Sequence, residues 1–267
     1  MGKHWRLLVE STPGTGWWNM AVDEVLFASA TAGAPPVLRL YEWRGPWLSL
    51  GYAQPFPAAL GAACRSAGVN VVRRVTGGRA VLHGGDLTYG VAAAAAALPA
   101  GLESSYRLLS DAILAALREL GVEAERAATA SAIAPAADFD CFAIPATDEI
   151  CAGGRKLAGS AQRRAAGALL QHGSIRLEPD PPGAAAAVGL GRGATSLVEL
   201  GVAAASARET LALALPAALG RLLGVRFEAD ALQSGERRAA EERALRLQRD
   251  PLGRRAAGTF PASRARC

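Results

Sequence analysis

Two glycine pairs, Gly77-Gly78 and Gly84-Gly85, interrupt an apolar and β-branched stretch between residues 70 and 92. This pattern predicts three short strands joined by tight turns, because glycine adopts the positive φ that such turns require. Three successive strands must pair within a sheet, and sequence segments with helical periodicity lie before and after this region. The sequence therefore favours an α/β (α+β) fold in which a mixed sheet is covered by helices.

The first glycine turn is surrounded by side chains that can bind an anion. Arg73, Arg74 and Arg79 flank it, and His83 ends the strand that follows. Guanidinium groups recognise carboxylates and phosphates. The stretch lacks the lysine of a P-loop, and its glycines join strands rather than open a helix as in a dinucleotide-binding fingerprint. Taken alone, the pattern fits either an ordinary hairpin turn or a turn that binds a carboxylate or phosphate.

The rest of the chain reads as strands in the middle with helices around them. Asn19 is expected to cap the first helix. Residues 127–135 are expected to be a linker, and residues 179–194 a connection rich in proline, glycine and alanine. No domain boundary is evident before about residue 225, so we predict one domain over 1–232 and a basic helical tail over 233–267. Strands are predicted over 5–10, 37–43, 47–52, 70–74, 80–83, 87–92, 149–152, 155–162 and 167–177, and helices over 19–30, 104–120, 206–224 and 233–248.

Composition narrows the class of protein. The chain is 51% hydrophobic and 20% charged, which is enough for a sizeable core. No apolar run approaches the ~20 residues of a membrane span, and the first residues do not resemble a signal peptide, so we expect a cytoplasmic protein with no membrane contact. Free thiols are expected in that compartment for the cysteines, which are Cys64, Cys141, Cys151 and Cys267.

The positive charge is concentrated at the C-terminal end. Residues 233–267 hold nine arginines and four acidic residues, which account for the whole net charge of +5. The predicted helix over 233–248 has no aromatic side chains among its arginines, so nucleic-acid binding is not expected. A solvated basic helix, or one that attracts an acidic partner, fits better.

The combination VVRRVTGG-RAVLH followed by DLTY resembles the signature of the lipoate-protein ligase and octanoyltransferase superfamily, which includes the biotin protein ligases. Three further segments resemble segments of the family and occur in the same order as in the family. They are residues 18–54, GRKLAGSAQRR over 154–164, and LQHGSI over 170–175. The likeness covers about residues 5–200. It implies a biotin/lipoate-protein-ligase-like catalytic domain, with a larger mixed sheet and a smaller sheet flanked by helices.

The resemblance also implies a set of functional residues. Lys156 would be catalytic and point at the reacting carbonyl group. It is one of two lysines in the chain, the other being Lys3, which suggests a chemical need beyond positive charge. The resemblance places acyl or lipoyl binding at Arg73, Arg74, Thr76, Gly77, Gly78, Arg79, His83, Gly159, Ser160 and His172.

Two chemistries share this family scaffold. A ligase activates lipoate with ATP and Mg²⁺, whereas an octanoyltransferase needs a cysteine thiolate as nucleophile and no cofactor. Cys141 lies in CFAIPATDE, which resembles the CFxxPSxYE segment of the LipM-type octanoyltransferases. Ala146 and Asp148 depart from that pattern, and Glu149 fits it. Cys151 is the alternative nucleophile.

The resemblance thus predicts octanoyl transfer from acyl carrier protein, through a thioester on Cys141, to a lysine of a lipoyl-domain protein. Such acceptors include the glycine cleavage H protein and the E2 subunit of 2-oxoacid dehydrogenases. An ATP-dependent lipoate ligase is the alternative, and a non-catalytic acyl- or lipoate-binding protein is a third. Acidic partners would be steered by arginines of the tail, which are Arg237, Arg238, Arg243 and Arg246.

A metal site is not expected. His83, His172 and Cys141 are possible zinc ligands in principle, but no HxxxH or CxxC spacing supports them. Either histidine can instead shape a pocket as a hydrogen-bonding group. His4 is expected at the surface.

Overall fold

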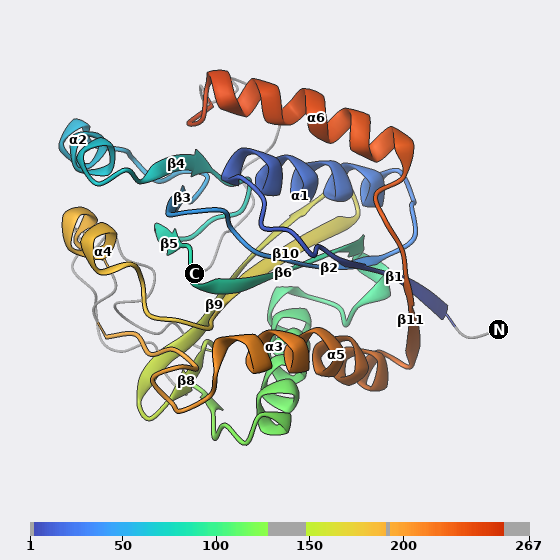
Figure 1. The fold of residues 1–267 in the computed structure, drawn as a ribbon. Helices are drawn as coiled ribbons and strands as arrows, with labels where there is room; N and C mark the ends of the chain where they lie inside the picture. The colour runs from blue at the N-terminus through green and yellow to red at the C-terminus, as the bar shows by residue number, and fades with distance from the viewer. Residues whose placement is uncertain (1–2, 128–147, 191–192, 254–267) are drawn as a thin grey trace.

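A computed structural model describes residues 3–127, 148–190 and 193–253 of the 267-residue chain. A large sheet forms its centre, with helices on both faces and a smaller sheet at one end (Figure 1). This is the architecture predicted from the sequence. Within the described ranges no helix is long and apolar enough to cross a membrane.

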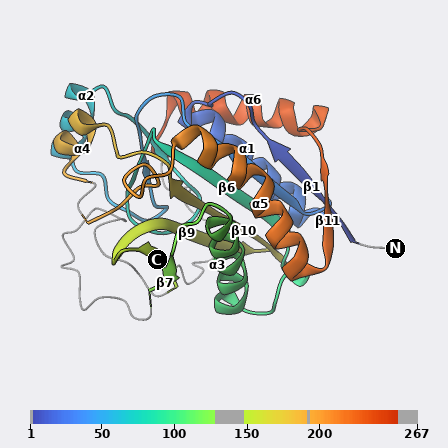
Figure 2. The same ribbon diagram turned by 60° about the horizontal axis from the view of Figure 1, so that its bottom comes forward.

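The large sheet has eight strands in the order β11-β1-β2-β6-β10-β9-β8-β7. β1 runs parallel to β11 and to β2, and the other neighbouring pairs are antiparallel, so the sheet is mixed. Figure 2 shows the long strands β6, β9 and β10 crossing its middle. The strands are β1 (Lys3–Val9), β2 (Val37–Tyr41), β6 (Asp86–Ala94), β7 (Glu125–Arg126), β8 (Ile150–Ala152), β9 (Arg155–Ala165), β10 (Ala168–Arg176) and β11 (Val225–Ala229).

The small sheet contains the strands around the first glycine turn. Its central strand β3 (Trp47–Leu50) pairs in parallel with β4 (Asn70–Arg73) and antiparallel with β5 (Val81–His83). The strands predicted on either side of Gly77-Gly78 are confirmed, but β4 and β5 pair with opposite edges of β3, so the glycines lie in a connection across β3 and not in a tight turn between paired strands. Two short helices, α2 (Ala58–Ser66) and α4 (Pro182–Val188), pack beside this sheet.

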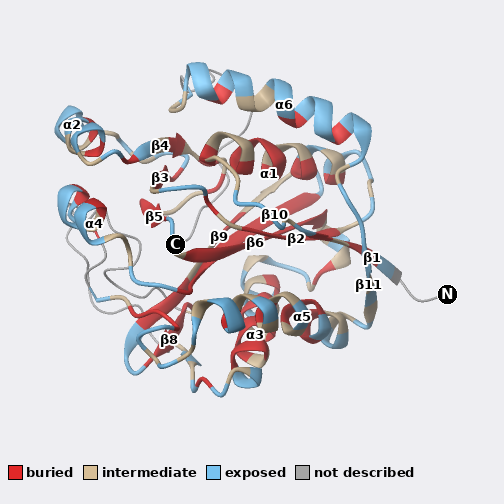
Figure 3. Ribbon diagram, viewed as in Figure 1, coloured by how far each residue is buried: buried red, intermediate tan, exposed pale blue. Residues whose placement is uncertain are grey.

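Longer helices cover the two faces of the large sheet. α1 (Gly16–Thr31) and α6 (Ser234–Arg249) lie on one side, and α3 (Leu102–Glu119) and α5 (Ala204–Leu223) lie on the other (Figure 1). A short 3₁₀ turn, η1 (Ala95–Ala97), follows β6. The central strands of the sheet are buried, whereas the edge strand β11 and the outer faces of the helices are largely exposed (Figure 3). The core thus lies between sheet and helices, as amphipathic helices require.

One prediction about local structure is wrong. Asn19 does not cap the first helix, because the helix begins at Gly16 and the hydroxyl of Thr15 accepts the Trp18 N–H at 3.3 Å. Asn19 is buried inside the helix and donates to the Glu42 carbonyl at 3.0 Å. The connection predicted over 179–194 contains the short helix α4, which was not predicted and whose Ala184 and Val188 are buried against the small sheet.

Helix α6, at the start of the predicted tail, is a packed layer of the structure. It lies on α1, with Ala240 and Leu247 buried. Glu236 accepts two hydrogen bonds from the buried guanidinium of Arg6 in β1, at 2.7 and 2.8 Å. A division of the chain at residue 232 stays a prediction, but α6 itself is held to the sheet by ionic and apolar contacts.

Candidate active site

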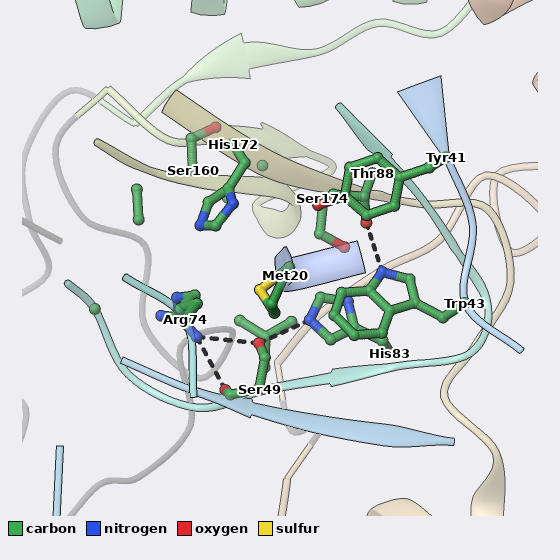
Figure 4. A pocket seen from close by; sticks show the side chains of 15 residues that line it. Met20, Tyr41, Trp43, Ser49, Arg74, His83, Thr88, Ser160, His172 and Ser174 are labelled. Carbon is green, nitrogen blue, oxygen red and sulfur yellow. Dashed lines mark hydrogen bonds between the residues drawn. The ribbon is translucent and has the colours of Figure 1, made fainter. Parts of the chain in front are cut away.

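A cavity lies between the two sheets, where the small sheet faces β2, β6, β9 and β10 of the large one (Figure 4). Its lining is mostly apolar, and Met20 of α1 projects into it. Ser160 and His172 stand on one side of the cavity, and Trp43 and His83 on the other. The lining residues are Met20, Tyr41, Trp43, Ser49, Arg74, Gly78, Val81, His83, Thr88, Gly159, Ser160, Ala161, His172, Gly173 and Ser174.

Much of the predicted site gathers around this cavity. Thr76 lies directly behind the wall, where it contacts His172, and Arg73, Gly77 and Arg79 do not line the cavity. Motifs separated by about 100 residues in the sequence thus meet at one place. The predicted binding residues that line it are Arg74, Gly78, His83, Gly159, Ser160 and His172.

His172 is fixed between a carboxylate and a hydroxyl. Its Nδ1 lies 2.8 Å from Asp23 Oδ2, and its Nε2 lies 2.6 Å from Thr76 Oγ1. Asp23 also accepts hydrogen bonds from Arg39 at 2.7 Å and from Tyr41 at 2.8 Å. Burial raises the pKa of Asp23, but the hydrogen bond from His172 and the charge of Arg39 outweigh it, so the net shift is downward. An ionised Asp23 accepts only, so His172 carries its proton on Nδ1.

His83 has the same arrangement on the opposite side. Its Nδ1 lies 2.9 Å from Asp86 Oδ2, and its Nε2 lies 2.8 Å from Ser49 Oγ. Trp43 stacks on the imidazole with ring centroids 3.8 Å apart. Burial raises the pKa of Asp86, but the charge and hydrogen bond of His83 and the hydrogen bond from Ser174 lower it overall. Both histidines are therefore held in a fixed orientation, because each ring nitrogen has a hydrogen-bonding partner.

Arg74 supports the glycine turn. Its guanidinium donates to the carbonyl groups of Ser49 at 2.9 Å, Gly77 at 2.9 Å and Arg79 at 2.6 Å. Gly51 packs so closely on this turn that an added Cβ would lie 1.8 Å from the Gly78 carbonyl oxygen. The turn therefore needs glycine at a neighbouring strand end as well as within itself.

Arg73 points away from the cavity. It donates to the carbonyl groups of Gly51 and Gln54, both at 2.7 Å, and to that of Leu252 at 2.8 Å. Its own N–H donates to the Pro251 carbonyl at 2.9 Å. Arg73 thus ties the chain after β3 and the end of α6 to β4.

Lys156 lies in β9 behind Gly159, which is part of the cavity wall. Its side chain is fully buried and forms an ion pair with Glu149, with Nζ and Oε2 2.6 Å apart. The pairing of β8 with β9 shifts by one residue between Ile150 and Cys151, which is a β-bulge. Bulges redirect side chains beside functional sites. The sequence placed Lys156 on a strand but did not show its buried partner.

The two candidate nucleophiles are Cys141 and Cys151. Cys141 lies outside the described residues. Cys151 is a buried free thiol opposite Lys156 in the β8–β9 pairing, and it does not line the cavity. Burial and the nearby Glu149 raise the pKa of Cys151, although Lys156 acts in the opposite direction. A raised pKa favours the unreactive thiol. Cys64 is likewise a buried free thiol in α2.

Several residues of the site escaped the sequence analysis, namely Asp23, Tyr41, Trp43, Ser49, Thr88 and Ser174. Thr88 and Ser174 lie within the DLTY and LQHGSI motifs, and the other four lie within the segment 18–54, but none of the six was singled out. The available signal was Asp23, an acidic residue among the apolar positions of a predicted helix. Buried carboxylates are rare unless paired, so this position was a reason to expect a partner.

Comparisons with known proteins agree with this geometry. The family model described as "Lipoyl protein ligase A/B catalytic domain" matches residues 15–201. The chain is 38% identical to the octanoyltransferase LipM of Kyrpidia tusciae, over 89% of this chain and 94% of that protein. It is 42% identical to the octanoyltransferase LipM of Symbiobacterium thermophilum, over 68% of each chain.

Solved structures show the same fold. A lipoate-protein ligase A bound with ATP superposes with a TM-score of 0.72 at 25% identity, over 90% of this chain and 94% of that one. A T. acidophilum protein with bound lipoic acid, described as a lipoate protein ligase, gives 0.71 at 25% identity over the same shares. Together with the family match and the two octanoyltransferases, these likenesses show that the chain belongs to the lipoyl protein ligase A/B catalytic domain family.

Proposed function

We propose that the protein transfers an octanoyl group from acyl carrier protein to a lysine of a lipoyl-domain protein, as a step of lipoate biosynthesis in the cytoplasm. The observation that carries this proposal is the 38% identity to an octanoyltransferase LipM over 89% of the chain. The mostly apolar cavity supports it, because an aliphatic acyl chain gains by leaving water. The CFAIPATDE segment, which resembles the cysteine motif of such enzymes although Ala146 and Asp148 depart from it, supports it further.

The proposed reaction has two acyl transfers. The thiolate of Cys141 attacks the octanoyl thioester of the carrier protein, and the carrier thiol leaves. The acceptor lysine then attacks the new thioester on Cys141 and releases its sulfur. Lys156, as an ammonium, stabilises the thiolate and the charge that develops on the carbonyl oxygen, with backbone N–H groups near Gly77-Gly78 or the Lys156 strand as further donors.

The donor thioester is already activated, so this route uses no ATP, metal or other cofactor. Its acceptors would be lipoyl-bearing proteins such as the glycine cleavage H protein or a 2-oxoacid dehydrogenase E2 subunit. Incubation with octanoyl-carrier protein should add one octanoyl mass to the protein, and hydroxylamine should remove it. A Cys141→Ala variant should not gain the mass, whereas a Cys151→Ala variant should.

An ATP-dependent lipoate ligase is the second candidate, favoured by the likeness to a lipoate-protein ligase solved with ATP. It predicts pyrophosphate exchange that depends on lipoate and Mg²⁺. If pyrophosphate exchange is absent and an octanoyl adduct forms on Cys141, the protein is a transferase and not a ligase. Single-turnover transfer to a lipoyl domain would exclude a non-catalytic binding protein.

A further inference from the structure

The ion pair between Lys156 and Glu149 lies in the interior beside the cavity. The two side chains are 0% and 1% exposed, and their charged atoms are 2.6 Å apart. Removing two charges from water is unfavourable, and a buried pair of this kind is poor evidence for a purely stabilising role. A chain that has two lysines and many arginines has kept a lysine at this buried position.

The position of Gly159 shows how close the pair is to the cavity. Gly159 lines the cavity, and an added Cβ there would lie 2.7 Å from Lys156 Nζ and 3.3 Å from Glu149 Oε1. The ammonium and the carboxylate thus lie directly behind the part of the wall that has no side chain. A reacting group in the cavity could approach both of them there.

Contacts made by Asp148 and by the Glu149 backbone hold Glu149 directly before β8. Asp148 adopts a positive φ of 69°. Few residues other than glycine tolerate such a φ, and aspartate adopts it more readily than an aromatic residue does. The Asp148 carboxylate accepts from Arg107 at 3.1 Å, and its N–H donates to the Ala127 carbonyl at 3.1 Å. The Glu149 carbonyl in turn accepts from the Ala127 N–H at 2.8 Å. These backbone contacts therefore fix Glu149 at the point where β8 begins.

We propose that Glu149 is a positioning residue for Lys156, which holds the lysine as an ammonium and directs its Nζ toward the wall at Gly159. The inference rests on the proposed function, in which Lys156 stabilises negative charge. A buried lysine without a counter-charge favours the neutral amine, and a neutral amine stabilises neither a thiolate nor an oxyanion. Glu149 supplies that counter-charge and does not itself bind the acyl group.

The protons balance without a change at Glu149. In the first transfer the Cys141 thiol gives up its proton, the C–S bond to the carrier breaks, and the carrier leaves as a thiol with that proton. In the second, the acceptor amine loses a proton as the amide C–N bond forms, and the Cys141 sulfur regains it. Lys156 remains an ammonium throughout, which is the state that Glu149 maintains.

The test is the pH dependence of single-turnover acylation from octanoyl-carrier protein, measured by intact mass. Glu149→Gln should slow acylation about 10- to 100-fold at pH 8. It should also move the alkaline limb of the pH–rate profile to lower pH, by about one unit or more, because the lysine loses its proton more easily. Glu149→Asp keeps the charge and should slow the reaction while leaving the alkaline limb in place.

Glu236→Gln is the matched control, because it removes another buried carboxylate from an ion pair, with Arg6, away from the cavity. It should leave the shape of the profile unchanged. A Glu149→Gln profile that coincides with that of the wild type would overturn the inference. If that variant does not fold, Glu149→Asp decides, and a wild-type rate for it would be the contrary result. Failure of the wild type to form any adduct would instead refute the proposed function.

Discussion

At the scale of single residues, the site depends on side chains whose partners are far away in the sequence. His172 and Asp23 are 149 positions apart in the sequence, and His172 Nδ1 lies 2.8 Å from Asp23 Oδ2. No spacing rule connects them, so the sequence indicated His172 as a pocket residue and did not indicate Asp23. Lys156 shows the same limit, because its strand was predictable and its buried pairing with Glu149 was not.

Replacing Asp23 tests the support of His172. Asp23→Asn removes the charge that balances buried Arg39, and it should lower the free energy of unfolding by about 3 kcal/mol at pH 7. The folded-state pKa of Asp23 is lowered, so its contribution is present above the unfolded value of about 3.9 and is lost as the pH falls through the folded value. Urea titrations should therefore show the difference shrinking below about pH 4. A difference independent of pH would contradict this account.

Replacing Gly159 tests whether the close approach of Lys156 to this position of the cavity wall matters for acyl transfer. Gly159→Ala places a methyl group 2.6 Å from Lys156 Cε and 2.7 Å from Nζ, so the ammonium must move. We expect acyl transfer to fall by about 100-fold, the scale of a misplaced catalytic group. Gly183→Ala is the control, because a Cβ there meets nothing within 4 Å and its φ is not positive. Equal activity of the two variants in a single-turnover assay would be inconsistent with this placement.

At the scale of elements, periodicity and glycine placement predicted most of the strands and helices. The strands on either side of Gly77-Gly78 and the hairpin of β8 and β9 were expected, since each is a local pattern. β11 and α2 were missed. β11 is stabilised by pairing with β1, more than 200 residues earlier, and α2 is a short helix that packs against the small sheet. Structure that depends on such distant contacts leaves little local signal.

The start of α1 gives an element-level prediction. Thr15→Ala removes the side-chain oxygen that accepts the Trp18 N–H, and it should lower stability by about 1 kcal/mol. Thr12→Ala changes an exposed threonine outside the helix and should have little effect. Thermal or urea unfolding measures both. Two variants of equal stability would mean that the Thr15 hydroxyl does not cap the helix.

At the scale of the whole molecule, α6 places arginines on an outer surface while Arg73 ties its end to the strand before the glycine turn. Arg237, Arg238 and Arg246 are exposed, and Arg243 pairs with Glu24 at 2.6 Å. Exposed positive charge speeds encounter with acidic partners and acts mainly at low salt. A role of this surface in docking an acidic carrier domain is a prediction of the proposed function.

Charge reversal tests that role. Arg237→Glu combined with Arg238→Glu should slow acylation by octanoyl-carrier protein about tenfold at 20 mM salt, and the rates should converge near 0.5 M salt. Arg221→Glu combined with Arg226→Glu makes the same change at exposed positions of α5 and β11. If both pairs respond alike, net charge rather than this surface governs the encounter.

The most direct measurement of the central claim is intact-mass analysis of the protein after incubation with octanoyl-carrier protein. The account predicts one added octanoyl group in the wild type and in Cys151→Ala, removable by hydroxylamine, and none in Cys141→Ala. The adduct should disappear when a lipoyl domain is added and reappear on that domain as an amide. An adduct that persists in Cys141→Ala, or transfer that requires ATP, would contradict the claim.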